Sequence, residues 1–220
     1  MVSQYFHTLF AQPEQMDAFW AAGWRHFGTF FFRYATNTWQ GKRCTVLPLR
    51  IDLSSFSLSQ SQKRVLKRNA DLRVLIRETY IDEEKEELFE QHKNRFSHNV
   101  PESIYSFLSP VPDSVPCANR EICVYEGDKL LAVSFLDLGE TATSAVYAMF
   151  DLAESKRSLG IFLILVGIRF SQENGFRYYY PGYAYREPSF YDYKKRFSGL
   201  EYYDWKKGWK PFKSELRTED

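Results

Sequence analysis

The stretch 145–194 limits the fold most strongly, because it reads as a strand, a buried helix and a second strand in succession. Ala145 to Phe150 is an apolar strand candidate, and a polar turn leads from it into an apolar helix predicted from Arg157 to Gln172. Asn174 and Gly175 end this helix, and a tyrosine-rich strand follows. This order is a βαβ crossover, which places both strands in one sheet with the helix packed against it.

A β-hairpin is predicted directly before this crossover. Glu121 to Tyr125 and Leu130 to Leu138 flank a Glu126-Gly127-Asp128 turn, and Gly139-Glu140 turns the chain into the strand at 145. Three antiparallel strands that feed one crossover helix predict an α+β fold with a mixed, mostly antiparallel sheet.

A small N-terminal lobe is predicted at residues 1–58, ahead of a main domain at 59–220, unless the two form one compact unit. Residues 13–22 begin with Pro and acidic residues and end before Gly23, as a short helix does. Thr29 to Tyr34 and Thr45 to Ile51 are expected to be strands, because a polar loop separates two apolar runs.

A basic helix is predicted from Gln62 to Ala70, with Ser59 or Ser61 as its cap. Its cations lie on neighbouring turns at Lys63, Arg64, Lys67 and Arg68. The stretch from Lys42 to Arg77 carries nine Lys or Arg against two Asp, a net charge of +7, whereas the whole chain carries +1. Such a patch gives salt-sensitive affinity for nucleic-acid phosphates. The alternative interpretation is an ordinary solvated helix face.

The cysteines and common motifs exclude several classes of chemistry. Cys44, Cys117 and Cys123 include no CxxC pair, so neither a disulfide framework nor a structural metal site is expected. None of the four histidines stands at metal-ligand spacing, and GxSxG, HExxH, P-loop and GxGxxG motifs are absent. A hydrolase or a kinase is therefore not supported.

The first residues lack the basic start and apolar run of a signal peptide, and no window holds about 18 uninterrupted apolar residues. The odd cysteine set suits a reducing compartment. The sequence thus predicts a cytoplasmic protein without a membrane partner.

The start of the crossover helix, at Leu159 and Gly160, is a candidate anion site. Free backbone N–H groups and the positive end of the helix dipole suit a phosphate or a developing oxyanion there. Close packing of Gly160 against the strand is an equal alternative. GNAT acyltransferases share this strand-helix-strand order, with a pyrophosphate loop of the form Arg/Gln-x-x-Gly-x-Gly/Ala. This chain has Arg157 at the first position but Phe162 at the last small one, which disfavours CoA as the donor.

Seven short runs carry a resemblance to a known family. They are GWRHFG at 23–28, Pro48 to Ile51, SQSQKRVLKRNADL at 59–72, Phe150-Asp151, Ser158 to Gly160, Gly182-Tyr183, and Tyr193-Lys194 through Phe197. In this order they resemble the aminoacyl-tRNA protein transferases, which include arginyl-transferases and bacterial leucyl-transferases. The resemblance extends from about residue 20 to 205 and is most specific in the basic helix.

This resemblance implies a GNAT-like acyltransferase domain that moves an amino acid from a charged tRNA to the N-terminal amine of a protein. The acceptor would begin with Asp or Glu, as in N-degron protein degradation. The family's cysteine-rich segment ahead of the Pro48 run is reduced to Cys44, and Pro188, Phe190 and Tyr191 replace its Cys and Lys-Met residues. No metal and no cofactor are therefore expected.

The donor in this interpretation is an ester that is already activated, so the protein must chiefly position an amine and hold an oxyanion. Asp151 is the expected group to bind or deprotonate the amine, with helix capping as its alternative. The backbone at Leu159 and Gly160 is expected to face the oxyanion or the terminal adenosine phosphate.

Substrate binding is expected from Arg25, Arg50, Tyr147, Tyr180 and Tyr183, and tRNA binding from Lys63, Arg64, Lys67 and Arg68. For Arg25, recognition of an acidic acceptor side chain competes with a structural salt bridge. A CoA-dependent N-acyltransferase and a non-catalytic tRNA-binding homologue remain the alternative functions.

Overall fold

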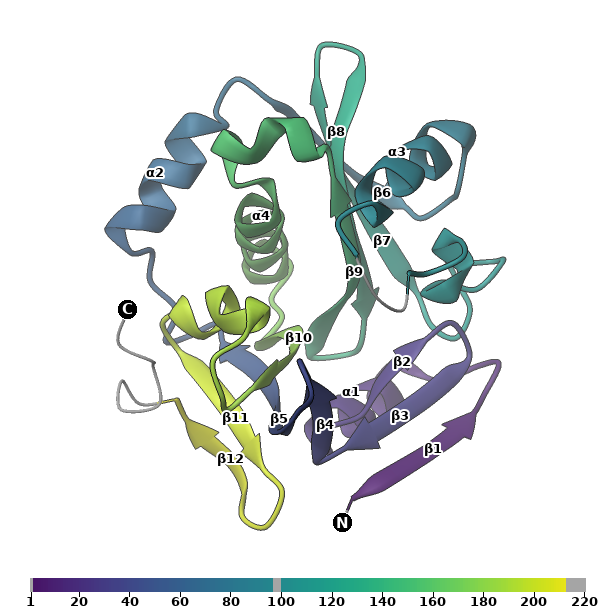
Figure 1. Ribbon diagram of the computed structural model, residues 1–220, viewed down its shortest axis with the longest axis vertical. Helices are drawn as coiled ribbons and strands as arrows, with labels where there is room; N and C mark the ends of the chain where they lie inside the picture. Colours follow the sequence, from purple (N-terminus) through teal and green to yellow (C-terminus); the bar gives the residue numbers. More distant parts are fainter. Residues whose placement is uncertain (1, 97–99, 213–220) are drawn as a thin grey trace.

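A nine-stranded mixed sheet forms the centre of the protein, of which the computed structural model describes residues 2–96 and 100–212 (Figure 1). Its order is β12-β11-β5-β10-β9-β8-β7-β6, with β4 paired to β5. The strands are β4 Thr36–Trp39, β5 Lys42–Asp52, β6 Arg73–Glu78, β7 Asn119–Glu126, β8 Lys129–Leu138, β9 Ala142–Phe150, β10 Tyr178–Tyr185, β11 Leu200–Asp204 and β12 Gly208–Pro211. Among the described pairs, only β9 with β10 is parallel. The predicted α+β fold with a mixed, mostly antiparallel sheet is confirmed.

A second, three-stranded sheet lies in the N-terminal part, in the order β1-β3-β2. It consists of β1 Ser3–His7, β2 Arg25–Phe27 and β3 Phe30–Tyr34, and the helix α1 Pro13–Ala21 accompanies it. Stacked and edge-on aromatic rings, including Phe6, Phe31 and Trp24, hold these elements together. The strand β5 belongs to the main sheet, so the boundary predicted at residue 58 does not separate the two sheets.

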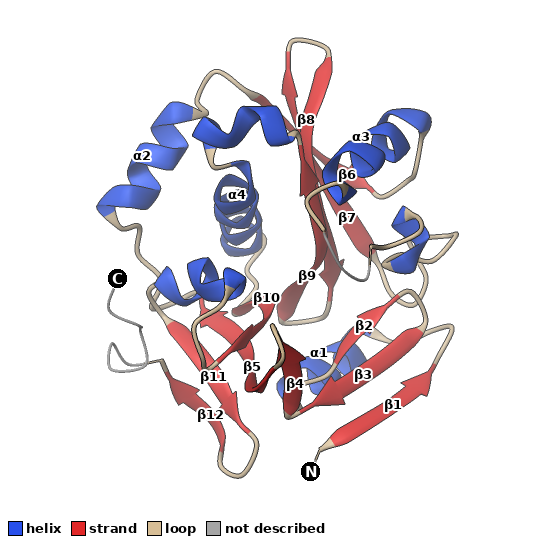
Figure 2. Ribbon diagram, viewed as in Figure 1, coloured by secondary structure: helices blue, strands red, loops and turns tan. Residues whose placement is uncertain are grey.

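Helices cover both faces of the main sheet (Figure 2). The α-helices are α2 Gln60–Arg68, α3 Glu83–Lys93 and α4 Leu159–Glu173, and the 3₁₀ helices are η1 Ile104–Ser106, η2 Leu152–Arg157 and η3 Phe190–Arg196. The helices α4 and α2 pack over one apolar core, whereas α3 and η1 cover a second core on the other face. No helix in the described part of the chain has the length and apolar character needed to cross a membrane.

Two helix starts show how local sequence sets these bounds. Ser59 caps α2, because its hydroxyl accepts from the backbone of Gln62 at 3.2 Å while the Gln62 side chain accepts from the Ser59 N–H at 2.9 Å. The helix α4 begins two residues later than predicted. Arg157 ends η2 instead, and Ser158, with a φ of 57°, separates the two helices.

The parallel pair β9 and β10 is short and then opens. Only three residue pairs join the strands, the last being Tyr180 with Ser144. Beyond it, β9 follows β8 to Phe150, and β10 follows β5 to Tyr185 past a register shift at Gly182. We call this parting, between residues 145–150 and 181–185, the β9/β10 split. The confirmed crossover helix α4 connects its two sides.

Candidate active site

Arg25 fills the base of the β9/β10 split. Its guanidinium donates to the Ser144 hydroxyl and to the Ala145 carbonyl, where β9 leaves β10. The side chain is buried and forms no ion pair with any described carboxylate. The guanidinium has five N–H donors, so several remain for another partner. The structure thus brings the predicted residue Arg25 to the split without the competing salt bridge.

Lys194, from η3, enters the same place from the other side. Its ammonium donates to the Tyr183 carbonyl at 3.4 Å, which is a long hydrogen bond. A Cβ at Gly182 would lie 3.1 Å from Nζ of Lys194 and 3.8 Å from Nη2 of Arg25. The glycine, with a φ of 101°, therefore leaves room for two cationic side chains to approach the strand together.

Arg95, just beyond α3, is the third cation of this group. Its guanidinium lies 3.2 Å from Nε2 of His92 and stacks over the Phe190 ring at 4.7 Å. His92 is buried, and its Nδ1 lies 2.9 Å from the Phe150 carbonyl at the end of β9. Burial and the Arg95 charge lower the pKa of His92 to about 4, so the imidazole is neutral and its Nε2 can accept from Arg95.

Together, Arg25, Lys194 and Arg95 form what we call the cation cluster. Burial, Arg25 and Arg95 lower the pKa of Lys194 to about 7, so both guanidiniums act on this amine. No member of the cluster forms an ion pair with a carboxylate of residues 2–96 or 100–212. Arg25 is buried and the other two cations are half-buried, and cations without a carboxylate partner are costly in such places, so this arrangement suits an anionic ligand.

Tyr147 supplies an unpartnered hydroxyl on the β9 side. Its ring stacks on Phe107 with centroids 4.0 Å apart, and its buried hydroxyl has no hydrogen-bond partner within the described chain. Burial raises the pKa of Tyr147 to about 12, so the group is a neutral donor. Tyr183 contributes its carbonyl to Lys194, while its hydroxyl donates to the Gly23 carbonyl at 2.6 Å.

Two other predicted substrate-binding residues lie in a separate cluster. Tyr180 packs between Trp20 and Trp209, and Arg50 stacks on Trp209 while its Nε lies 2.6 Å from Glu201. The structure does not bring Tyr180 or Arg50 together with the cation cluster. Both have packing and charge partners of their own.

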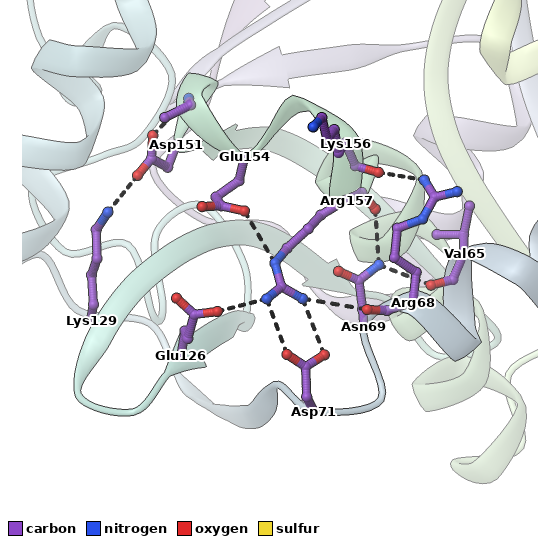
Figure 3. A network of polar contacts seen from close by, with 11 residues as sticks. Val65, Arg68, Asn69, Asp71, Glu126, Lys129, Asp151, Glu154, Lys156 and Arg157 are labelled. Atoms are coloured by element: carbon purple, nitrogen blue, oxygen red, sulfur yellow. Dashed lines mark hydrogen bonds and ion pairs between the residues drawn. The ribbon is translucent and has the colours of Figure 1, made fainter.

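The residues around the start of α4 form a closed polar network (Figure 3). The Arg157 guanidinium meets Glu126 at 2.6 Å, Asp71 at 3.0 Å and Glu154 at 3.1 Å. These carboxylates raise the pKa of Arg157, with Asp71 the main cause. The side chain that resembled the start of a pyrophosphate loop is therefore neutralised within the protein. Phe162, expected to obstruct a phosphate, is instead buried in the core.

Asp151 lies in the same network and has two partners. One carboxylate oxygen accepts from the Ala153 N–H at 2.9 Å, and the other pairs with Lys129 at 2.7 Å. Lys129 lowers the pKa of Asp151, which makes it a weak base. A Cβ at Gly160 would lie 3.2 Å from the Phe150 ring, so this glycine allows close packing of α4 on β9. The oxyanion role of Leu159 and Gly160 stays a prediction.

The four predicted tRNA-binding cations of α2 are all exposed: Lys63, Arg64, Lys67 and Arg68. Val65 and Leu66 face inward, and Arg68 donates to the Lys156 carbonyl in η2. The net charge of the stretch 42–77 does not form one patch. Arg77 pairs with the buried Glu121, for example, which leaves α2 as its basic face.

One buried group could hold a metal, although the sequence predicts none. The ligand atoms of His26, Cys117 and Asp137 lie within 4.8 Å of one another. Asp137 is already engaged by Nε2 of His26 at 2.7 Å and by the Asn119 amide at 2.8 Å. Without an ion this network links β2, next to Arg25, to β8. His98, another predicted non-ligand, lies outside the described residues.

Lys194, Arg95 and His92 were not selected from the sequence. Lys194 stands in a run of three basic residues with no motif to separate it from Lys195, and Arg95 follows an ordinary amphipathic helix. The one available signal was the Tyr193-Lys194 pair, which belongs to the family resemblance.

The fold is a GNAT-like α+β domain, and comparison with known proteins specifies the family. Residues 77–204 match the model of the family described as arginine-tRNA-protein transferase, C terminus. The aspartate/glutamate leucyltransferase of Saccharophagus degradans is 30% identical over 188 residues, which cover 81% of this chain and 75% of that protein. The chain belongs to this family of aminoacyl-tRNA protein transferases.

Two further similarities agree with this assignment. The aspartate/glutamate leucyltransferase of Helicobacter hepaticus is 27% identical over 209 residues, or 91% of this chain and 83% of that protein. Among solved structures, the C-terminal domain of a protein described as a lysylphosphatidylglycerol synthetase, from Agrobacterium fabrum, has a TM-score of 0.51 and 19% identity. That alignment covers 64% of this chain and 47% of that one, and it concerns the fold alone.

Proposed function

We propose that this protein transfers an amino acid from a charged tRNA to the N-terminal amine of an acceptor protein that begins with Asp or Glu. Family membership and the names of the leucyltransferase relatives support this reaction. The structural observation that supports it most directly is the cation cluster at the β9/β10 split. It offers two guanidiniums and an amine without a carboxylate partner among the described residues.

An acidic acceptor side chain is the ligand that fits the cluster. A carboxylate held by Arg25 and Arg95 would supply the negative charge that these cations lack. The Tyr147 hydroxyl provides a further donor for a polar group of either substrate. An uncharged Asn or Gln side chain would leave the cations uncompensated, so the cluster favours Asp and Glu.

The donor end would lie toward α4 and α2. The Asn69 amide donates to the Arg157 carbonyl at 2.9 Å, which ties the C-terminal end of the basic helix to the start of α4. The exposed cations of α2 would hold tRNA phosphates and direct the terminal adenosine toward the Leu159 and Gly160 backbone. Positioning of an activated ester supplies about 7 to 11 kcal/mol of the barrier without ATP or a metal.

A CoA-dependent N-acyltransferase is less well supported. Arg157, the cation of the pyrophosphate-loop pattern, is already paired with Asp71, Glu126 and Glu154, so it is not available to a pyrophosphate. Calorimetry with acetyl-CoA tests this alternative, because detectable binding at millimolar ligand would support it. A non-catalytic homologue would bind tRNA in a salt-dependent manner and transfer nothing.

The deciding experiment is a transfer assay with a mixed pool of charged, radiolabelled tRNAs at low salt. Four peptides that differ only in the first residue, Asp, Asn, Glu or Gln, serve as acceptors. We expect label on the Asp and Glu peptides and little on the amides. A folded protein that labels no peptide would contradict the proposal. Charged tRNA is a cytoplasmic donor, and the transfer would install a new N-terminal residue of the N-degron type.

A further inference from the structure

Lys194 is half-buried, and it differs from the two lysines that are buried within the described residues, Lys85 and Lys195. Lys85 pairs with Asp82 at 2.9 Å and Glu121 at 3.3 Å, and the neighbouring Lys195 pairs with Asp192 at 2.7 Å. Lys194 has no carboxylate partner within residues 2–96 and 100–212. Lys194 donates a long hydrogen bond to the Tyr183 carbonyl. A half-buried ammonium with such a weak acceptor is poorly stabilised in its charged form.

The charged neighbours of Lys194 favour its neutral form, whereas its aromatic neighbours attract the ammonium only weakly at their distances. Arg25 comes from β2 and Arg95 from beyond α3, and both repel an ammonium. From η3 itself, the neutral rings of Tyr191 and Tyr193 lie 5.3 and 6.0 Å from Nζ. With burial, these neighbours bring the pKa to about 7, so a large fraction of the amine is free at neutral pH.

We propose that Lys194 is the general base that removes a proton from the α-ammonium group of the acceptor. This inference rests on the proposed function, and it assigns to Lys194 the task that the sequence suggested for Asp151. The two carboxyl oxygens of Asp151 are occupied by Lys129 and the Ala153 N–H, whereas the Lys194 amine lies beside Gly182 and Arg25 at the split with no carboxylate partner among the described residues. An ammonium with a pKa of about 7.7 to 8.0 is closely matched to such a base.

The proposed transfer step moves two protons, forms one C–N bond and breaks one C–O bond. Lys194 takes one proton from the acceptor α-ammonium and becomes an ammonium itself. The freed amine nitrogen attacks the ester carbonyl carbon, and a C–N bond forms while the carbonyl oxygen becomes an oxyanion. When the oxyanion collapses, the C–O bond to the ribose of the tRNA breaks. The second proton of the attacking nitrogen passes to that ribose oxygen, and Lys194 later releases its proton to water.

The arrangement also couples recognition to catalysis. An acceptor carboxylate bound by Arg25 and Arg95 would cancel the charges that hold the pKa of Lys194 down. The base would then become stronger when an Asp- or Glu-started acceptor binds. The pH profile of kcat, which reports the bound enzyme, should therefore show a higher apparent pKa than the profile of kcat/KM.

The test compares pH profiles of the wild type, Lys194→Arg and the matched control Lys195→Arg. For the wild type we expect kcat/KM for an Asp-started peptide to rise with pH and level off above about 7. Lys194→Arg should lose about 100-fold at pH 7, and its rise should move to the α-amine range of about 7.7 to 8.0. Lys195→Arg should keep the wild-type profile.

Chemical rescue of an alanine variant tests the same role without depending on how well an arginine side chain fits in place of Lys194. A tertiary amine should restore activity to Lys194→Ala, because it accepts a proton but forms no stable amide. An unchanged profile in Lys194→Arg, or a raised KM with kcat and profile intact, would overturn the proposal and make Lys194 a binding cation. Circular dichroism verifies the fold of each variant. If the wild type transfers no amino acid at all, the proposed function fails instead.

Discussion

The start of α4 and the β9/β10 split are both rich in charged side chains, but these have ion-pair partners in the first region and lack them in the second. At the start of α4, Arg157 meets three carboxylates and Asp151 meets Lys129 (Figure 3). At the split, Arg25, Lys194 and Arg95 meet none among the described residues. The first network uses its charges to hold loops together, whereas the second leaves them available to a ligand.

The two regions contribute differently to the stability of the fold. Neutralised pairs contribute modestly to stability, and an uncompensated cluster lowers it. A fold retains such a cluster at the cost of stability where a substrate supplies the missing charge. The number of charged residues in a segment is thus a poor guide to a binding site. Charged side chains that lack an ion-pair partner within the protein are a better guide to a binding site.

Replacement of Arg25 should give the largest effect. Lysine keeps the charge but cannot reach Ser144, Ala145 and a ligand at once. We expect Arg25→Lys to lower kcat/KM for an Asp-started peptide by about 100-fold, and that for the matched Asn-started peptide far less. Arg33→Lys, on the neighbouring strand, is the control and should change neither. Equal losses for both peptides would reduce Arg25 to a structural link between β2 and β9.

Charge reversal on α2 should have the next largest effect, on tRNA binding. The double variant Lys63→Glu and Lys67→Glu removes two exposed cations and adds two repulsive charges. We expect tRNA affinity at low salt to fall about 10- to 100-fold, with a shallower salt dependence. The exposed pair Lys206 and Lys207, reversed in the same way, controls for net charge. Equal losses in both variants would show that α2 is not a specific tRNA surface.

The sequence predicted those parts of the molecule that depend on neighbours along the chain. The crossover, the hairpin and the Ser59 cap each follow from residues within a few positions of one another. Helix α4 shows the limit of this approach. The sequence predicts its start at Arg157, because no local pattern indicates that Ser158 takes a left-handed conformation.

The cation cluster could not be predicted in the same way. Its members come from β2, from beyond α3 and from η3, and only the fold brings them together. The carboxylates that neutralise Arg157 likewise come from distant segments, Asp71 and Glu126 among them. A sequence shows which residues carry charge, but the partners that cancel it are set by tertiary contacts.

Arg157→Gln tests whether the start of α4 is structural. Loss of three partly exposed ion pairs should lower the free energy of unfolding by about 1 to 2 kcal/mol, measured by urea denaturation. Transfer activity should stay within about threefold of wild type, because the guanidinium is already neutralised. A loss beyond 100-fold without a change in stability would mean that the Arg157 guanidinium itself binds substrate. The contrast between the two regions would then fail.

Asp151→Asn should give the smallest effect and separates the two candidate bases. Asparagine can still accept from the Ala153 N–H, so the variant loses chiefly the ion pair with the exposed Lys129, which contributes little to stability. Because Lys129 lowers the pKa of Asp151, the wild-type advantage is present above the unfolded pKa of about 3.9. It should disappear as pH falls through the lower folded value.

The pH dependence of the activity of Asp151→Asn shows which of the two residues is the general base. A carboxylate with a lowered pKa stays ionised at neutral and basic pH, so it cannot produce a rise in rate near pH 7. Asp151→Asn should therefore keep the rise that Lys194→Arg loses. If Asp151→Asn instead lowers kcat by 100-fold or more and Lys194→Arg does not, Asp151 is the general base. The cation cluster would then serve only to hold the acidic side chain of the acceptor.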